Sequence, residues 1–151
     1  MIEQSHHLNR RIVIPRAIDE VFSFFSEAGN LERITPPELN FHILTPQPVL
    51  MTQGTRLDYR LSLFGVGFGW QTLISTWEPP RLFIDEQVKG PYRQWIHTHR
   101  FVENADGTEV LDHVQYQLPL WPMGEIVLPI VRRQVSRIFD YREQVIREVF
   151  R

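Results

Sequence analysis

Two aromatic residues flank two histidines in one short stretch of the chain. Within residues 92–103, Trp95, His97, His99 and Phe101 follow one another at every second position. Side chains at this spacing share one face of a β-strand. Imidazole groups can donate, accept or transfer a proton near neutral pH. We therefore expect a strand whose inward face forms the wall of a pocket.

A carboxyl group and a phenol are predicted to face the same pocket from the next strand. The sequence NADG at 104–107 is typical of a tight hairpin turn. After this turn, apolar residues alternate in a pattern that carries Asp112 and Tyr116 to the inward face, across the hairpin from the histidines. We therefore expect Asp112 to lie beside His97 and His99.

Three roles are open for this polar group. Buried His–Asp and Tyr–Asp contacts often do no more than satisfy one another inside a sheet. The same groups could orient the hydroxyl or carbonyl of a ligand, or a histidine held by a carboxylate could act as a general base for enolisation or dehydration. Covalent catalysis has little support, because the chain has no cysteine and no serine in a GxSxG turn.

Metal binding is not expected. His97, His99, His113 and Asp112 have the chemistry of metal ligands, but alternation places His113 on the opposite face from Asp112, so the four cannot converge. We also expect no cofactor, since the glycines at 65–69 lack the lysine and following helix of a phosphate-binding loop.

Asp85 and Glu86 are neighbours on another predicted strand, so only one of them can face the pocket. In one register Phe83 and Asp85 point inward. In the other, the more apolar set that includes Ile84 points inward and buries Glu86 beside an arginine. The sequence leaves both registers open.

Periodicity elsewhere predicts the elements that must position these residues. We expect a first strand at 8–14, two short helices at 17–25 and 31–34, and a long amphipathic helix at 123–150. Period-two stretches predict six further strands, at 41–44, 55–64, 68–77, 82–88, 92–103 and 108–120. The arginines of the long helix, among them Arg132, Arg133, Arg137, Arg142 and Arg147, are assigned to its solvated face, and His6 and His7 to the surface or a disordered end.

A meander of this length must curl, and the long helix is the element able to cover its concave side. This arrangement predicts a hollow of about 300–1,000 Å³, the usual volume of a small-molecule site. The expected sheet walls are Leu57, Tyr59, Leu61, Leu63, Trp70, Thr72 and Ile74. The side chains expected to close the hollow from the helix side are Phe22, Phe25, Phe41, Val131, Val135, Ile138 and Phe139.

The composition is that of an ordinary globular protein, and 151 residues suit one domain spanning 1–151. A net charge of −2 gives no basic field for nucleic acid or for recruitment to a membrane surface. The absence of cysteine, of a secretory h-region and of an apolar run of about 18 residues leads us to expect a cytoplasmic protein without stable membrane insertion. The sequence sets no oligomeric state.

Several motifs resemble those of the START-like or SRPBCC superfamily, which includes pollen-allergen-like proteins. They are NLERITPP (30–37), WEPP (77–80), DEQ (85–87), GPYRQWIHTHRF (90–101) and IFDYR (138–142). The chain is most similar to a bacterial cyclase/dehydrase-like, ligand-binding subgroup. The resemblance implies an α+β helix-grip fold, in which a curved seven-stranded antiparallel sheet, two short helices and a long C-terminal helix enclose a cavity.

The same resemblance implies the function that we expect. The leading expectation is binding or sequestration of a small hydrophobic molecule, lipid-like, aromatic or polyketide-like. The alternative is a cyclase or dehydratase that uses a His/Asp acid–base pair. Relatives fused to an epimerase-like domain also suggest an epimerase-like protein as a partner. The expected ligand contacts are Tyr59, Trp70, Trp95, His97, His99, Asp112, Tyr116 and Phe139.

Overall fold

The computed structural model describes residues 4–151 and has the predicted α+β architecture. The helical elements are α1 (Ile18–Ser26), α2 (Gly29–Arg33), the 3₁₀ turns η1 (Pro37–Leu39) and η2 (Met123–Val127), and α3 (Leu128–Val149). The strands are β1 (His6–Ile14), β2 (His42–Ile43), β3 (Arg56–Leu63), β4 (Val66–Glu78), β5 (Leu82–Lys89), β6 (Gln94–Asn104) and β7 (Gly107–Gln117). The seven strands within residues 4–151 each overlap a stretch that the alternation predicted.

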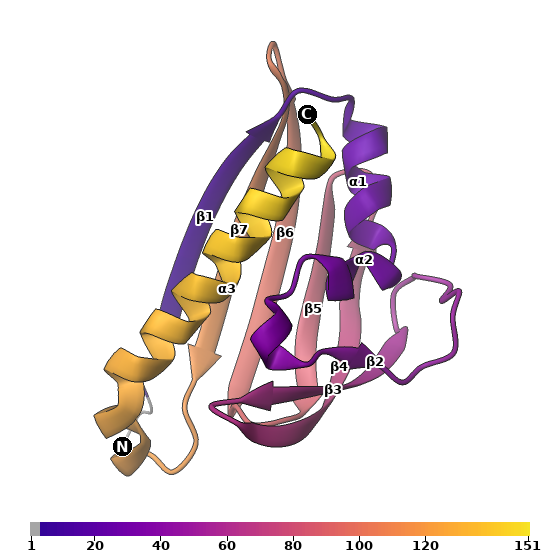
Figure 1. Ribbon diagram of the computed structural model, residues 1–151. Coiled ribbons are helices and arrows are strands. Elements are labelled where there is room, and N and C mark those ends of the chain that lie inside the picture. Colours follow the sequence, from indigo (N-terminus) through magenta and orange to yellow (C-terminus); the bar gives the residue numbers. More distant parts are fainter. Residues whose placement is uncertain (1–3) are drawn as a thin grey trace.

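One antiparallel sheet contains every strand, in the order β1-β7-β6-β5-β4-β3-β2. Strands β3 to β7 follow one another as hairpins, whereas β1 pairs with β7 at the far end of the chain. Figure 1 shows α3 lying along β1 and β7, and α1 and α2 on the other side of α3 from β1. Helix α1 contacts one end of β6 and β7, and α2 contacts β2. The long helix and the short helices therefore cover different parts of one curved face, and this is the helix-grip fold.

The β6–β7 hairpin has the two-residue turn that NADG predicts, since Asn104 pairs with Gly107. Gly107 has a φ of +132°, which L side chains rarely adopt. A Cβ atom at this position would lie 2.1 Å from the carbonyl oxygen of Ile14. Only glycine therefore lets the turn approach the end of β1.

Strand β4 bends because its pairing with β5 shifts register twice, between Gln71 and Thr72 and between Ile74 and Thr76. Each irregularity increases the local twist of a strand. These bulges help to curve the sheet around the space under the helices.

The long helix begins later than the sequence predicted. Residues 123–127 form the 3₁₀ turn η2, and α3 begins at Leu128 with Pro129 in its first turn. Proline is tolerated there because the first backbone N–H groups of a helix have no intrahelical acceptor. The expected helix at 123–150 was therefore too long at its start.

His6 was predicted to lie at the surface or in a disordered end, and this prediction was wrong. Its side chain is buried at the start of β1, where Nε2 lies 2.8 Å from a carboxylate oxygen of Glu125. The contact ties the first strand to η2. His7 points the other way, is exposed, and stacks on His113 on the outer face of the sheet.

No helix within residues 4–151 is long and apolar enough to cross a membrane.

Candidate functional site

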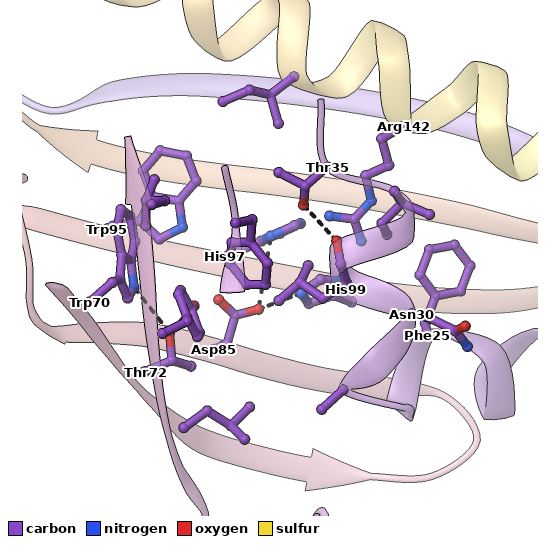
Figure 2. A pocket seen from close by; sticks show the side chains of 18 of the residues that line it. Phe25, Asn30, Thr35, Trp70, Thr72, Asp85, Trp95, His97, His99 and Arg142 are labelled. Atoms are coloured by element: carbon purple, nitrogen blue, oxygen red, sulfur yellow. Dashed lines mark hydrogen bonds and ion pairs between the residues drawn. The ribbon is translucent and has the colours of Figure 1, made fainter. Parts of the chain in front are cut away.

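A cavity of about 150 Å³ lies between the curved sheet and the helices. It is smaller than the predicted range of about 300–1,000 Å³, because aromatic side chains fill much of the space. The lining comes from β3, β4, β5 and β6 on one side and from α1, α2 and α3 on the other. Figure 2 shows the polar side chains at the centre of this lining and Trp70 and Trp95 at one end.

The predicted sheet walls of the cavity are all present. The lining includes Leu57, Tyr59, Leu61, Leu63, Trp70, Thr72 and Ile74. On the helix side, Phe25, Phe41, Ile138 and Phe139 also line it. Phe22, Val131 and Val135 do not, because they pack among the members of two hydrophobic clusters that reach the cavity only through other residues, such as Phe83 and Phe139. Alternation therefore located the sheet walls better than helical periodicity located the opposite side.

The two predicted histidines lie side by side under the cavity. Their rings stack with centroids 3.6 Å apart and planes 26° apart. His97 Nε2 lies 2.7 Å from Asp112 Oδ1, and His99 Nε2 lies 2.5 Å from Asp85 Oδ2. In each pair the imidazole N–H donates to the carboxylate. The prediction that Asp112 lies beside the histidines is confirmed, and Asp85 provides a second carboxylate.

The structure decides the register of β5 that the sequence left open. Asp85 pairs with His97 across the sheet, and Phe83 is buried with its ring stacked 4.0 Å from that of His99. Glu86 consequently lies on the other face. Asp85 faces inward although its strand has the more apolar set on the outer face, because His99 gives it a hydrogen-bonding partner inside the protein.

Burial and mutual contacts shift the pKa values of these groups. Burial alone would raise the pKa of Asp85, but the hydrogen bond from His99 and the electrostatic interactions with His99, His97 and, last, Arg142 hold it below its ordinary value. The pKa of Asp112 is likewise lowered against burial, by Arg142 and by the hydrogen bond from His97. Burial, helped by His97, lowers the pKa of His99 to about 4. Near neutral pH the site thus holds two carboxylates and a neutral His99.

Arg142 was predicted to lie on the solvated face of the long helix, and this prediction was wrong. The residue is only 8% exposed and lines the cavity. Its guanidinium carbon lies 5.5 Å from the ring centroids of both Phe25 and Phe139. The position could have been found from spacing, since Arg142 falls three residues after Phe139 and four before Ile146 on the buried stripe.

Tyr59, Thr72 and Trp70 form a smaller polar group on the cavity wall. The Tyr59 and Thr72 hydroxyls are hydrogen-bonded, and Trp70 Nε1 donates to Thr72 Oγ1 at 3.1 Å. Burial, and to a smaller extent Asp85, raises the pKa of Tyr59. Tyr59 therefore keeps its proton and fixes the orientation of this wall.

Most of the predicted ligand contacts line the cavity. These are Tyr59, Trp70, Trp95, His97, His99 and Phe139. Asp112 and Tyr116 are not part of the lining. Asp112 lies behind the histidines, and Tyr116 is buried against Trp95, Tyr92 and His6. Contact of the lining residues with a ligand stays a prediction. Asp85 and Arg142 are two of the lining residues that the predicted set omitted.

Asp85, His97 and His99 each offer a ligand atom to a metal ion, and these atoms lie within 4.8 Å of one another. The arrangement nevertheless fits an ion poorly. An imidazole binds metal in its ring plane at about 2.0–2.1 Å, and two rings stacked 3.6 Å apart cannot both aim at one point between them. The short contact between Asp85 and His99 is better described as a hydrogen bond.

Comparisons with known proteins place the chain in a wider context. A family model described as "Polyketide cyclase / dehydrase and lipid transport" matches residues 14–139. No curated protein matches the chain in sequence.

Solved structures of the same fold come from several bacteria. A protein of Thermus thermophilus has a TM-score of 0.73 at 15% identity, with 96% of this chain and 95% of that chain covered. The Zhui aromatase/cyclase of Streptomyces sp. R1128 has a TM-score of 0.72 at 14% identity, covering 95% and 92%. A START superfamily protein of Mycobacterium smegmatis has a TM-score of 0.70 at 13% identity, covering 95% and 99%. Together the comparisons support a ligand-binding domain.

Proposed function

Because the chain belongs to the polyketide cyclase/dehydrase and lipid transport family, we propose that it binds a small, mostly apolar molecule inside its cavity. This membership confirms the START-like resemblance of the motifs. The observation that carries the proposal is the lining itself, in which aromatic and aliphatic walls surround a few converging polar groups. This combination is the usual form of a small-molecule site.

The cavity volume indicates the size of the ligand. An apolar cavity of about 150 Å³ can hold benzene, and this cavity has the same volume. A molecule with one aromatic ring therefore fits without moving the walls. A longer lipid-like or polycyclic molecule requires outward movement of the partly exposed side chains Met51 and Tyr92, which also line the cavity.

A cavity-filling variant tests the proposal. Leu61 is buried on the wall, and Leu61→Trp places the larger ring in the open space. Val102 is 43% exposed, and Val102→Trp makes a comparable change outside the cavity. We expect single-ring compounds to bind the wild type and Val102→Trp in titration calorimetry, and Leu61→Trp to bind them at least tenfold more weakly. Equal binding by folded Leu61→Trp would place the ligand elsewhere.

A cyclase- or dehydratase-type reaction is the second candidate, and the His97–Asp112 pair favours it. Neither Asp85 nor His99 adds a second general base to that pair. A general base works best when its pKa is near the working pH, whereas the pKa of Asp85 is lowered and that of His99 is about 4. Both are weak proton acceptors near neutral pH.

Mass spectrometry of small molecules from cell extract incubated with the protein separates the two candidates. Recovery of an unchanged ligand supports carriage. Conversion that is lost in His97→Gln and kept in His42→Gln supports catalysis, since His42 is exposed on the edge strand β2. The epimerase-like partner and the cytoplasmic location stay predictions.

A further inference from the structure

Arg142 presents hydrogen-bond donors to the cavity that the protein itself does not satisfy. Its side chain descends from α3 toward His99 (Figure 2). Within residues 4–151 the guanidinium has no hydrogen-bond acceptor and no carboxylate within 4 Å, and its buried Nε is unpartnered. Buried polar groups without partners are rare, and each requires an explanation.

The surroundings of Arg142 hold its guanidinium in place without using its donors. The ring centroids of Phe25 and Phe139 each lie 5.5 Å from the guanidinium carbon. Asp112 and Asp85 interact with it only through space, yet both have pKa values lowered by its charge. The structure therefore fixes the cation by packing and distant charge, and leaves the terminal N–H groups, which no acceptor within residues 4–151 uses, available to an oxygen atom in the cavity.

The charges around Arg142 restrict the functional group of the ligand to which that oxygen atom can belong. Asp85 lines the cavity and Asp112 lies directly behind His97, so two carboxylates are already present beside one guanidinium and the two imidazoles. His99, with a pKa of about 4, contributes no positive charge near neutral pH. A carboxylate ligand would bring a third negative charge into this buried group, which the low local dielectric makes unfavourable. An uncharged carbonyl oxygen can accept from Arg142 without adding charge.

We propose that Arg142 is the specificity-determining residue of the cavity and that it selects an uncharged carbonyl compound over a carboxylate of the same shape. The inference rests on the proposed binding function and adds the chemical class of the ligand. Asp85 assists the selection by repelling anions from the same end of the cavity.

Three single-ring compounds of similar shape test the proposal: acetophenone, benzoate and ethylbenzene. They are titrated into the wild-type protein near neutral pH and followed by calorimetry or ligand-observed NMR. A hydrogen bond to a charged donor predicts that acetophenone binds about tenfold more tightly than ethylbenzene. Benzoate should bind at least tenfold more weakly than acetophenone. Benzoate binding as tightly as acetophenone overturns the proposal.

A comparison of Arg142→Met with the control Arg133→Met then tests whether the selectivity comes from Arg142. Arg133 is exposed on the same helix. In Arg142→Met, acetophenone should lose about tenfold in affinity while ethylbenzene changes by less than about threefold. Arg133→Met should keep the wild-type preference. If Arg142 only balanced the charge of Asp112, Arg142→Met would lower the stability of the protein and keep the preference for acetophenone. That result would also overturn the proposal.

Arg142→Lys provides a second variant if Arg142→Met does not fold, because it keeps the charge beside Asp112 but loses the planar donor array. We expect a reduced preference for acetophenone in this variant, and an undiminished preference argues against the proposal. Failure of all three compounds to bind the folded wild type contradicts the binding function itself. Equal binding of all three leaves the binding function standing and removes only the assignment to Arg142.

Discussion

His97 and His99 stack on one another, yet each donates its hydrogen bond to a different carboxylate. Because each imidazole donates to its own carboxylate, both carboxylates have a donor and both rings are held in place. Such a network is stable only while its protonation states are kept. The most direct predictions at the scale of single residues therefore concern pH and charge.

We expect stability to fall as the pH is lowered, with His99 as one cause. Its pKa is 6.5 in an unfolded chain and about 4 in the folded protein. As the pH falls through this interval, the unfolded state takes up a proton that the folded state does not, so the free energy of unfolding decreases. The loss should be about 2 kcal/mol between about pH 7 and pH 5, measured by urea unfolding.

His99→Gln should remove much of this pH dependence, whatever its effect on stability at neutral pH. His42→Gln, at an exposed position, should keep the wild-type slope. An unchanged slope in His99→Gln would assign the acid sensitivity to other groups.

Asp112→Asn should destabilise the protein by about 3 kcal/mol, the usual effect of removing one partner from a buried ionic pair. The change removes the charge that faces Arg142 and weakens the acceptor of His97. Glu109→Gln is the control on the same strand, because Glu109 pairs with the exposed Arg11 on the outer face. Its effect should be below about 1 kcal/mol. Equal losses in chemical denaturation would contradict the importance of the buried network.

Strand alternation was sufficient to place Asp112 beside the histidines, because pairing across a hairpin is fixed by its turn. It could not place Asp85, since both faces of β5 carry apolar and charged residues. Arg142 was misplaced for a different reason. Arginine is rarely buried, so composition assigned it to solvent although its position follows the apolar stripe of α3.

At the scale of elements, the β6–β7 hairpin is the part of the sheet that joins the histidine strand to both β1 and Asp112. Gly107→Ala should destabilise the protein by more than about 2 kcal/mol, because the new Cβ meets backbone at a positive φ. Gly67→Ala is the matched control, with nothing within 4 Å of its Cβ position. Thermal unfolding of the two variants checks the difference, and similar melting temperatures would contradict it.

The boundaries of elements were predicted less well than their existence. Pro129 suits the first turn of a helix, but it does not by itself decide between a helix that starts there and a kink within a longer one. His6 extends β1 beyond its predicted start, where Glu125, more than 100 residues later, supplies a partner for its buried ring. A contact of this kind is invisible to local periodicity.

At the scale of the whole molecule, the curled meander and the long helix were enough to predict an enclosed hollow from the sequence. They were not enough to predict its volume. Rotamers of Trp70, Trp95 and Phe139 decide how much space remains, and the sequence does not specify them. The fold class was thus predictable, whereas the size limit on the ligand needed the structure.

Ligand binding should stabilise the entire fold, because the cavity is shared between the sheet and the helices. A compound that binds only the folded state raises the free energy of unfolding by about 2.7 kcal/mol at a concentration of 100 times Kd. Urea unfolding of the wild type with the tightest single-ring compound should show this increase, and Leu61→Trp should not. A compound that binds without stabilising the wild type would be bound to the unfolded chain or to the surface.

The pairing of the first strand with the last has a consequence during protein synthesis. Ile14 pairs with Thr108 and His6 pairs with Tyr116. Strand β1 therefore leaves the ribosome long before β7, its one neighbour in the sheet of residues 4–151, exists. At about 5–20 residues per second, the delay lasts several seconds or more. Throughout this interval the nascent chain carries an unpaired strand edge, and chaperones that recognise such edges would have their best opportunity to bind before β7 is made.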